Sequence, residues 1–150
     1  MAGPAGAVNW WTPEDLAHFR EVSQSLVRQY NAYQAFPDLS LNGELTLGEN
    51  IADLAGLTLA YDAYKASLGG KEAPVIDGFS GDQRFYLGWA QVWRRNYREA
   101  NLRQRLITDP HSPSEQRTAV VRNLDPWYEA FGVQPGQKLY LAPPDRVRIW

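Results

Sequence analysis

Two carboxylates four residues apart have the types and spacing needed for chemistry. Glu49 and Asp53 share one face of an expected helix, one turn apart. Their neighbours are mostly Leu, Ile, Ala and Gly, among which two buried carboxylates are costly unless a cation or hydrogen-bond donors meet them. In the functional interpretation, Glu49 ligates a metal, and Asp53 orients another metal ligand by a hydrogen bond without contacting the metal itself. In the alternative, which spacing alone favours, Glu49 lies in the first helical turn, where the helix dipole favours negative charge.

A histidine and an arginine form a second candidate group. His111 lies in the turn TDPHSP, residues 108–113, just before an expected helix, and Arg117 follows one and a half helical turns later. An imidazole in such a turn can donate a hydrogen bond to an oxyanion, and a guanidinium fork can hold a carbonyl or carboxylate group. The alternative is a solvent-exposed loop histidine near a solvated arginine, and residue types alone favour it.

The composition limits the classes of site and partner. There are no cysteines, so disulfides and thiolate zinc sites are excluded, and two histidines cannot make a self-sufficient histidine zinc motif. The net charge of −2 gives no basis for binding nucleic acid or an anionic membrane. No run approaches the roughly 18 apolar residues of a membrane span. We therefore expect a globular domain without nucleic-acid partners or a transmembrane helix.

The expected fold class is mainly α, with about five helices and an extended C-terminal tail. The helices are expected to begin at Thr12, near Leu47, and at Ser80, Ser112 and Asp125. Capping boxes mark the first, third and fourth of these starts. No segment indicates a convincing sheet, and residues 133–150 are expected to be extended or weakly strand-like.

The second helix carries the carboxylate pair and should occupy the centre of the fold. It is expected to run from about Leu47 to Ser67, and its residues are apolar or small on nearly all sides. His18 lies away from the apolar stripe of the first helix and is expected to be exposed. Five arginines are expected to form a solvated helix end and loop: Arg94, Arg95, Arg98, Arg103 and Arg105.

Four stretches together resemble the neprilysin and endothelin-converting-enzyme family of zinc metallopeptidases. Residues 42–53, NGELTLGENIAD, are similar to the family signature NGxxTLGENIAD. The other three stretches are residues 10–15 (WWTPED), 109–117 (DPHSPSEQR) and 146–150 (RVRIW). They stand in the family's order and cover the chain from about Asn9 to Trp150.

The resemblance implies a fold, a cofactor and four site residues. The fold is the C-terminal helical part of a zincin catalytic domain of the gluzincin type over residues 9–150. Residues 1–8 have no basic segment and no long apolar stretch, so from composition we expect a disordered leader there instead of a signal peptide. Glu49 corresponds to the third zinc ligand, and Asp53 to the carboxylate that steadies a zinc-bound histidine. His111 corresponds to the histidine that stabilises the oxyanion, and Arg117 to the arginine that contacts the substrate backbone. The implied substrates are peptides, and the parent family is periplasmic or secreted. The compartment of this chain stays open between these and the cytoplasm, because residues 1–8 do not indicate a signal peptide.

The family's HExxH helix is the main feature that these residues lack. It supplies two zinc ligands and the general base and belongs upstream of Trp10, where residues 1–8 stand. Because one glutamate cannot hold zinc tightly, we expect the chain alone to bind none and to be inactive. Self-association and a complementing N-terminal chain are the partners to test. The alternative is a non-catalytic helical module that binds a peptide or a protein.

Overall fold

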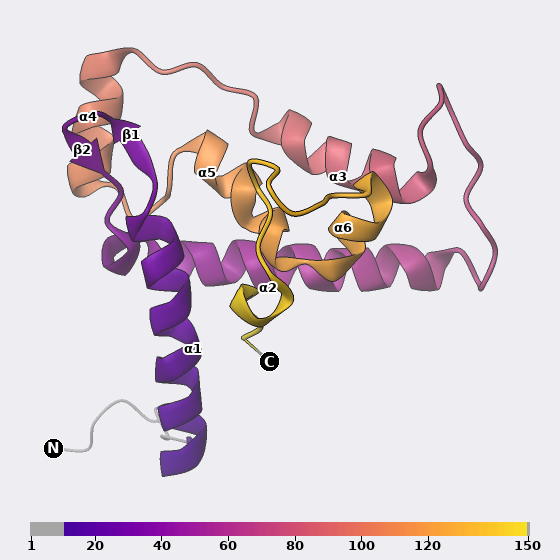
Figure 1. Cartoon of the computed structure of the whole chain (residues 1–150), viewed down its shortest axis with the longest axis horizontal. Coiled ribbons are helices and arrows are strands. Elements are labelled where there is room, and N and C mark those ends of the chain that lie inside the picture. Colours follow the sequence, from indigo (N-terminus) through magenta and orange to yellow (C-terminus); the bar gives the residue numbers. More distant parts are fainter. Residues whose placement is uncertain (1–10, 150) are drawn as a thin grey trace, which may run out of the picture.

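The computed structural model describes residues 11–149, and the chain folds around a long central helix (Figure 1). Six α-helices lie within this range: α1 (Pro13–Asn31), α2 (Gly43–Ser67), α3 (Gly81–Val92), α4 (Glu99–Thr108), α5 (Ser114–Thr118) and α6 (Asp125–Phe131). Two short 3-10 helices cover Ala119–Asn123 and Pro143–Asp145. The mainly α prediction is confirmed. The expected leader, Trp10 and Trp150 lie outside the described residues.

Helix α1 meets α2 near the beginning of α2 and runs away from it at a steep angle (Figure 1). Their core-facing side chains include Leu26 and Tyr30 of α1 and Leu54 and Leu57 of α2, all at most 5% exposed. The C-terminal tail closes the same core. It forms turns rather than the weakly strand-like finish that was one expectation, and it buries Val147 and Ile149.

Local capping explains two of the predicted helix starts. The Thr12 hydroxyl oxygen accepts the backbone N–H of Asp15 at 3.1 Å, so the predicted start of α1 is confirmed. Ser80 and Gln83 form a complete capping box at the start of α3. The predicted cap at Ser112 is wrong, because its hydroxyl donates to the Asn50 side chain at 2.7 Å and α5 begins two residues later.

Helix α2 begins earlier than the sequence suggested. Asn42 caps it by accepting the backbone N–H of Leu45, so the helix starts at Gly43 instead of near Leu47. Glu49 therefore lies in the second turn, and its interpretation as a first-turn residue is wrong. The expectation of burial on nearly all sides is also wrong. The other elements cover only one face of α2, and Leu59 on another face is 67% exposed.

Two elements were not predicted. Helix α4 has little apolar periodicity, and Arg103 and Arg105 on it form ion pairs instead of remaining solvated. A short antiparallel pair, β1 (Gln34–Phe36) and β2 (Leu39–Ser40), turns the chain between α1 and α2. Arg103 fastens this pair to α4, because it bonds both carboxylate oxygens of Asp38 at 3.0 and 3.1 Å.

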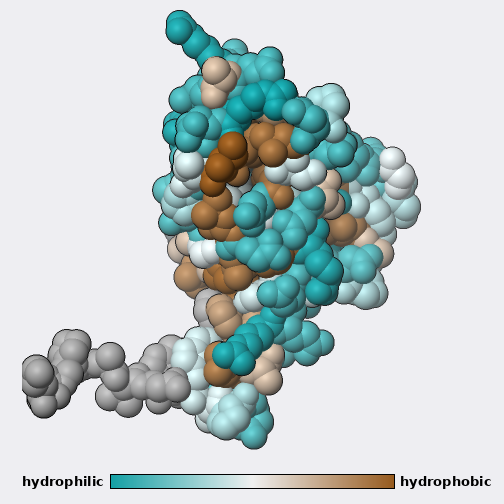
Figure 2. Space-filling model, turned by 90° about the vertical axis from the view of Figure 1, so that its left-hand side faces the viewer, coloured by the Kyte–Doolittle hydropathy of each residue, from teal (hydrophilic) through white to brown (hydrophobic). Residues whose placement is uncertain are grey.

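Apolar side chains also reach the surface. Figure 2 shows them gathered in the middle of the face that carries α4 and α1, surrounded by hydrophilic side chains. Val75, Val92 and Ile107 are each at least 66% exposed. No helix among residues 11–149 is long and apolar enough to cross a bilayer.

The close crossing of α1 and α2 gives the first prediction. A Cβ atom on Gly43 would meet the carbonyl oxygen of Val27 well inside van der Waals contact, whereas one on Gly56 in the same helix would meet nothing within 4 Å. We expect Gly43→Ala to lower the free energy of unfolding by about 1–3 kcal/mol. The matched control Gly56→Ala should raise it by roughly 0.5–1 kcal/mol. Urea unfolding of both variants checks this, and equal effects would contradict the packing described.

Candidate metal and substrate site

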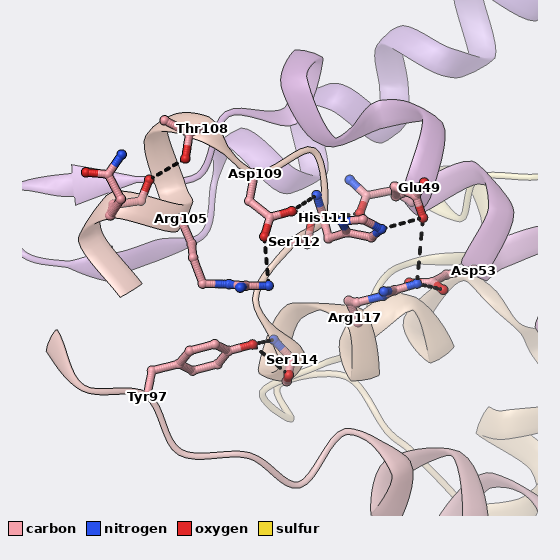
Figure 3. A network of polar contacts seen from close by, with 12 residues as sticks. Glu49, Asp53, Tyr97, Arg105, Thr108, Asp109, His111, Ser112, Ser114 and Arg117 are labelled. Carbon is pink, nitrogen blue, oxygen red and sulfur yellow. Dashed lines mark hydrogen bonds and ion pairs between the residues drawn. The ribbon is translucent and has the colours of Figure 1, made fainter. Parts of the chain in front are cut away.

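The four predicted site residues come together at one place (Figure 3). Glu49 and Asp53 project from α2, Arg117 projects from α5, and His111 lies in the turn before α5. His111 Nε2 is 3.3 Å from a Glu49 carboxylate oxygen, and Arg117 Nη2 is 4.0 Å from the same oxygen. Residues more than 50 positions apart in the sequence thus form a single polar group.

A buried ion pair joins α2 to α5. Arg117 Nε and Nη2 donate to the two carboxylate oxygens of Asp53 at 2.7 and 2.6 Å. The side chains are 6% and 15% exposed for Asp53 and Arg117, and the Arg117 guanidinium lies 4.0 Å from the centre of the Trp93 ring. These hydrogen bonds to Asp53 raise the pKa of Arg117. The cation expected to compensate a buried carboxylate is therefore Arg117.

Glu49 is held much more loosely than Asp53. Its side chain is 40% exposed, and its two partners lie at 3.3 and 4.0 Å. Asp53 takes up the short hydrogen bonds of Arg117, which leaves the Glu49 carboxylate at the surface of the group. A half-exposed carboxylate with such long contacts can give them up to bind a metal ion at low cost.

Asp109 fixes the orientation of His111. One Asp109 carboxylate oxygen lies 2.8 Å from His111 Nδ1 and accepts the backbone N–H of His111 at 2.9 Å. The backbone hydrogen bond is the main cause that lowers the pKa of Asp109, and the hydrogen bond to the ring acts in the same direction. The ionised carboxylate can only accept, so Nδ1 carries a proton, and Nε2 is the nitrogen that faces the second carboxylate, Glu49. The His111 ring is exposed, as expected for a solvent-exposed loop histidine, but Asp109 holds it in one orientation.

The turn that carries His111 is also fastened to α2. The Ser112 hydroxyl donates to the side-chain oxygen of Asn50 at 2.7 Å, and the Asn50 amide donates to Thr46 at 2.9 Å. These side chains are buried: Asn50 is 1% and Ser112 3% exposed. Asn50 follows Glu49 directly, so one helical segment positions the carboxylates and the histidine turn.

Sequence reasoning did not single out several residues of this group. Asn50 could have been found as a polar residue in an apolar helix that must hydrogen-bond when buried. Asp109 could have been found from its spacing of two residues to His111, which is typical of a side-chain turn. No sequence signal indicated Trp93 under Arg117. His18 is exposed on α1, as predicted, and lies outside the group.

A zinc site needs more ligands than this group contains. Structural and catalytic zinc sites use three or four protein ligands. Among residues 11–149, no three His, Cys, Asp or Glu side chains gather where they could hold a metal ion. The exposed Glu49 carboxylate fits the role of one ligand, and the described residues do not complete the set.

Comparison with known proteins identifies the family. The sequence model of Peptidase family M13 matches residues 2–147. The chain belongs to this family. Neprilysin-3 of Drosophila melanogaster is 34% identical over 152 residues, and human Endothelin-converting enzyme 1 is 35% identical over 145 residues. The resemblance to neprilysin-like zinc metallopeptidases is thereby confirmed.

The similarity covers nearly all of this chain but only part of its relatives. It spans 97% of the chain and 19% of Neprilysin-3, and 94% of the chain and 18% of the human enzyme. The inhibitor complex of the Mycobacterium tuberculosis zinc metalloprotease ZMP1 matches with a TM-score of 0.94 and 47% identity, over 97% of this chain and 23% of that one. The chain thus corresponds to about a fifth of the length of these M13 peptidases.

The buried ion pair gives the second prediction. We expect Asp53→Ala to lower the free energy of unfolding by about 3 kcal/mol, because it leaves the largely buried Arg117 cation without its hydrogen-bonded partner and with only the Glu49 carboxylate 4.0 Å away. Asp38→Ala removes a bidentate pair of similar geometry whose carboxylate is 68% exposed, so its effect should be much smaller. Urea unfolding measures both, and a similarly small loss in the two variants would contradict the structural role of the Asp53–Arg117 pair.

Proposed function

We propose that this chain is the C-terminal part of the catalytic domain of an M13 zinc metalloendopeptidase, in which Glu49 is one zinc ligand. The observation that carries the proposal is the position of Glu49: its carboxylate is 40% exposed and lies between His111 and Arg117, while Asp53 takes the short hydrogen bonds of Arg117. The family and the zinc metalloprotease ZMP1 support peptides as the substrate class.

The remaining zinc ligands would come from outside the described residues. In this proposal they stand on the HExxH helix that the family resemblance implies, supplied by another segment or by a second chain. When bound, zinc supplies Lewis-acid polarisation of a peptide carbonyl and activation of the attacking water. We infer that residues 11–149 alone bind zinc weakly or not at all and do not cleave peptides. Self-association through the exposed apolar surface would compete with binding of the segment or chain that carries the HExxH helix.

Asp53 would orient a zinc-ligating histidine while it holds Arg117. Each carboxylate oxygen has two acceptor positions, and Arg117 occupies one on each. A second acceptor position on Asp53 can therefore take the ring N–H of a histidine. Such a hydrogen bond fixes the ring's tautomer and its direction.

His111 would stabilise the negative charge that develops on the substrate carbonyl oxygen. Its Nδ1 is engaged by Asp109, and its Nε2 lies 3.3 Å from a Glu49 carboxylate oxygen. Because Nδ1 keeps its proton for Asp109, Nε2 can donate only in the imidazolium form, in which a second proton makes this nitrogen a hydrogen-bond donor to an oxyanion. The orientation is set before substrate arrives, which reduces the reorganisation that the reaction requires.

Arg117 would hold a backbone carbonyl of the substrate. Its Nε and Nη2 face Asp53, and no hydrogen bond from Nη1 to any described residue is present. The guanidinium is fixed between the Asp53 carboxylate and the Trp93 ring. An immobilised donor of this kind positions a peptide with little loss of side-chain entropy.

A chimera gives the third prediction and tests the proposal. This chain replaces the matching part of ZMP1, with which it shares 47% identity. The chimera should bind one zinc ion and cleave a peptide. Glu49→Ala should lower kcat/KM by more than the roughly 10–100-fold loss that removing a residue behind a ligand causes. Glu44→Ala, an exposed glutamate of the same helix, is the control and should retain activity.

Two outcomes would sink the proposal for Glu49. One is a folded chimera that binds zinc equally well with and without Glu49. The other is a folded wild-type chimera that binds no zinc, which would favour the non-catalytic module. Zinc content by atomic absorption, together with circular dichroism to show folding, separates these outcomes from simple misfolding.

The proposed role of His111 gives the fourth prediction. In the same chimera, we expect His111→Gln to lower kcat by about 10²–10³-fold, because one donor to the oxyanion is lost. Zinc content and KM should change little, since Glu49 and Arg117 are retained. Steady-state kinetics against His18→Gln, a control at the exposed histidine, checks this. An equal kcat in the two variants would rule out an oxyanion role for His111.

A further inference from the structure

Arg105 on α4 contacts the carboxylate that holds His111. Its Nη2 lies 2.7 Å from one carboxylate oxygen of Asp109, and the other oxygen of Asp109 is the one that His111 engages. The Asp109 side chain is 17% exposed and its two oxygens are thus divided between two partners. Figure 3 shows the resulting row of side chains from Arg105 through Asp109 and His111 to Glu49.

A tyrosine supports Arg105 from the other side. The Arg105 guanidinium lies 5.8 Å from the centre of the Tyr97 ring. The Tyr97 hydroxyl pairs with the Ser114 hydroxyl at 2.8 Å and accepts the Ser114 backbone N–H at 3.2 Å. Ser114 is the first residue of α5, the helix that carries Arg117. Tyr97, which hydrogen-bonds the first residue of α5, therefore helps to position Arg105 next to the site.

The position of Asp109 explains why a cation is needed there. Asp109 directly follows the last residue of α4, where the negative end of the helix dipole disfavours a carboxylate. The Arg105 charge offsets this repulsion, and its contact with one oxygen limits rotation of the carboxylate plane. The other oxygen then stays aligned with the Nδ1 and backbone N–H of His111.

We propose that Arg105 is a positioning residue for His111. Arg105 acts through Asp109 to keep the proton of the neutral His111 ring on Nδ1 and to leave Nε2 facing Glu49. The importance of this role for peptide cleavage rests on the function proposed above, but the state of the His111 ring does not. Arg103, two residues away on the same helix, bonds Asp38 and Glu99 instead. It is the matched control.

The chain itself permits a direct test, because it contains only two histidines. We would label both imidazoles with ¹⁵N and record their ring nitrogens by NMR, at a pH where the ¹⁵N shifts themselves show neutral rings. His18→Gln assigns the two sets of signals. Exposed His18 provides the reference for a ring in solvent. The expected result is a His111 ring protonated mainly on Nδ1, opposite to the preference of His18.

Variants of Arg105 then decide the proposal. Arg105→Ala should shift the His111 ring signals most of the way toward those of His18, whereas Arg103→Ala should leave them unchanged. Arg105→Lys keeps the charge without the planar fork and should give an intermediate shift. An unchanged Nδ1-protonated ring in both Arg105 variants would overturn the proposal. So would a wild-type His111 with the tautomer of His18, whether or not Glu49 binds zinc.

Discussion

The buried pair of Asp53 and Arg117 is the interaction on which the rest of the site depends. It joins the central helix α2 to the short helix α5. A carboxylate at 6% exposure is costly without compensation, and a bidentate guanidinium with an aromatic ring beneath it provides that compensation. The pair thereby fixes the spacing between the segment that carries Glu49 and the turn that carries His111.

The same pair determines what Glu49 can do. Two carboxylates one helical turn apart would compete for one cation if both were equally buried. Asp53 holds the short hydrogen bonds, and Glu49 remains at the surface with partners at 3.3 and 4.0 Å. The buried Asn50–Ser112 hydrogen bond holds the His111 turn beside it without using a charge. This arrangement presents one available carboxylate next to a histidine whose ring is already oriented, which the proposed roles of zinc ligand and oxyanion donor require.

The sequence predicted the parts of the fold that depend on local chemistry. The starts of α1 and α3 follow from caps that lie within four residues, and they were found. The start of α2 was missed because Gly43 is typical of a loop, whereas here it permits close contact with the Val27 backbone. The resemblance identified Glu49, Asp53, His111 and Arg117 as a group, but not how they pair. The pairing depends on contacts across 62 to 64 positions and on helix α4, whose charged sequence has no clear periodicity.

Anomalous diffraction at the zinc edge, from crystals of the ZMP1 chimera, tests the central claim most directly. A zinc peak about 2.0–2.2 Å from a Glu49 carboxylate oxygen, with the Asp53–Arg117 pair intact, is the result that we predict. A zinc ion held elsewhere, with Glu49 still in contact with His111 and Arg117, would contradict it.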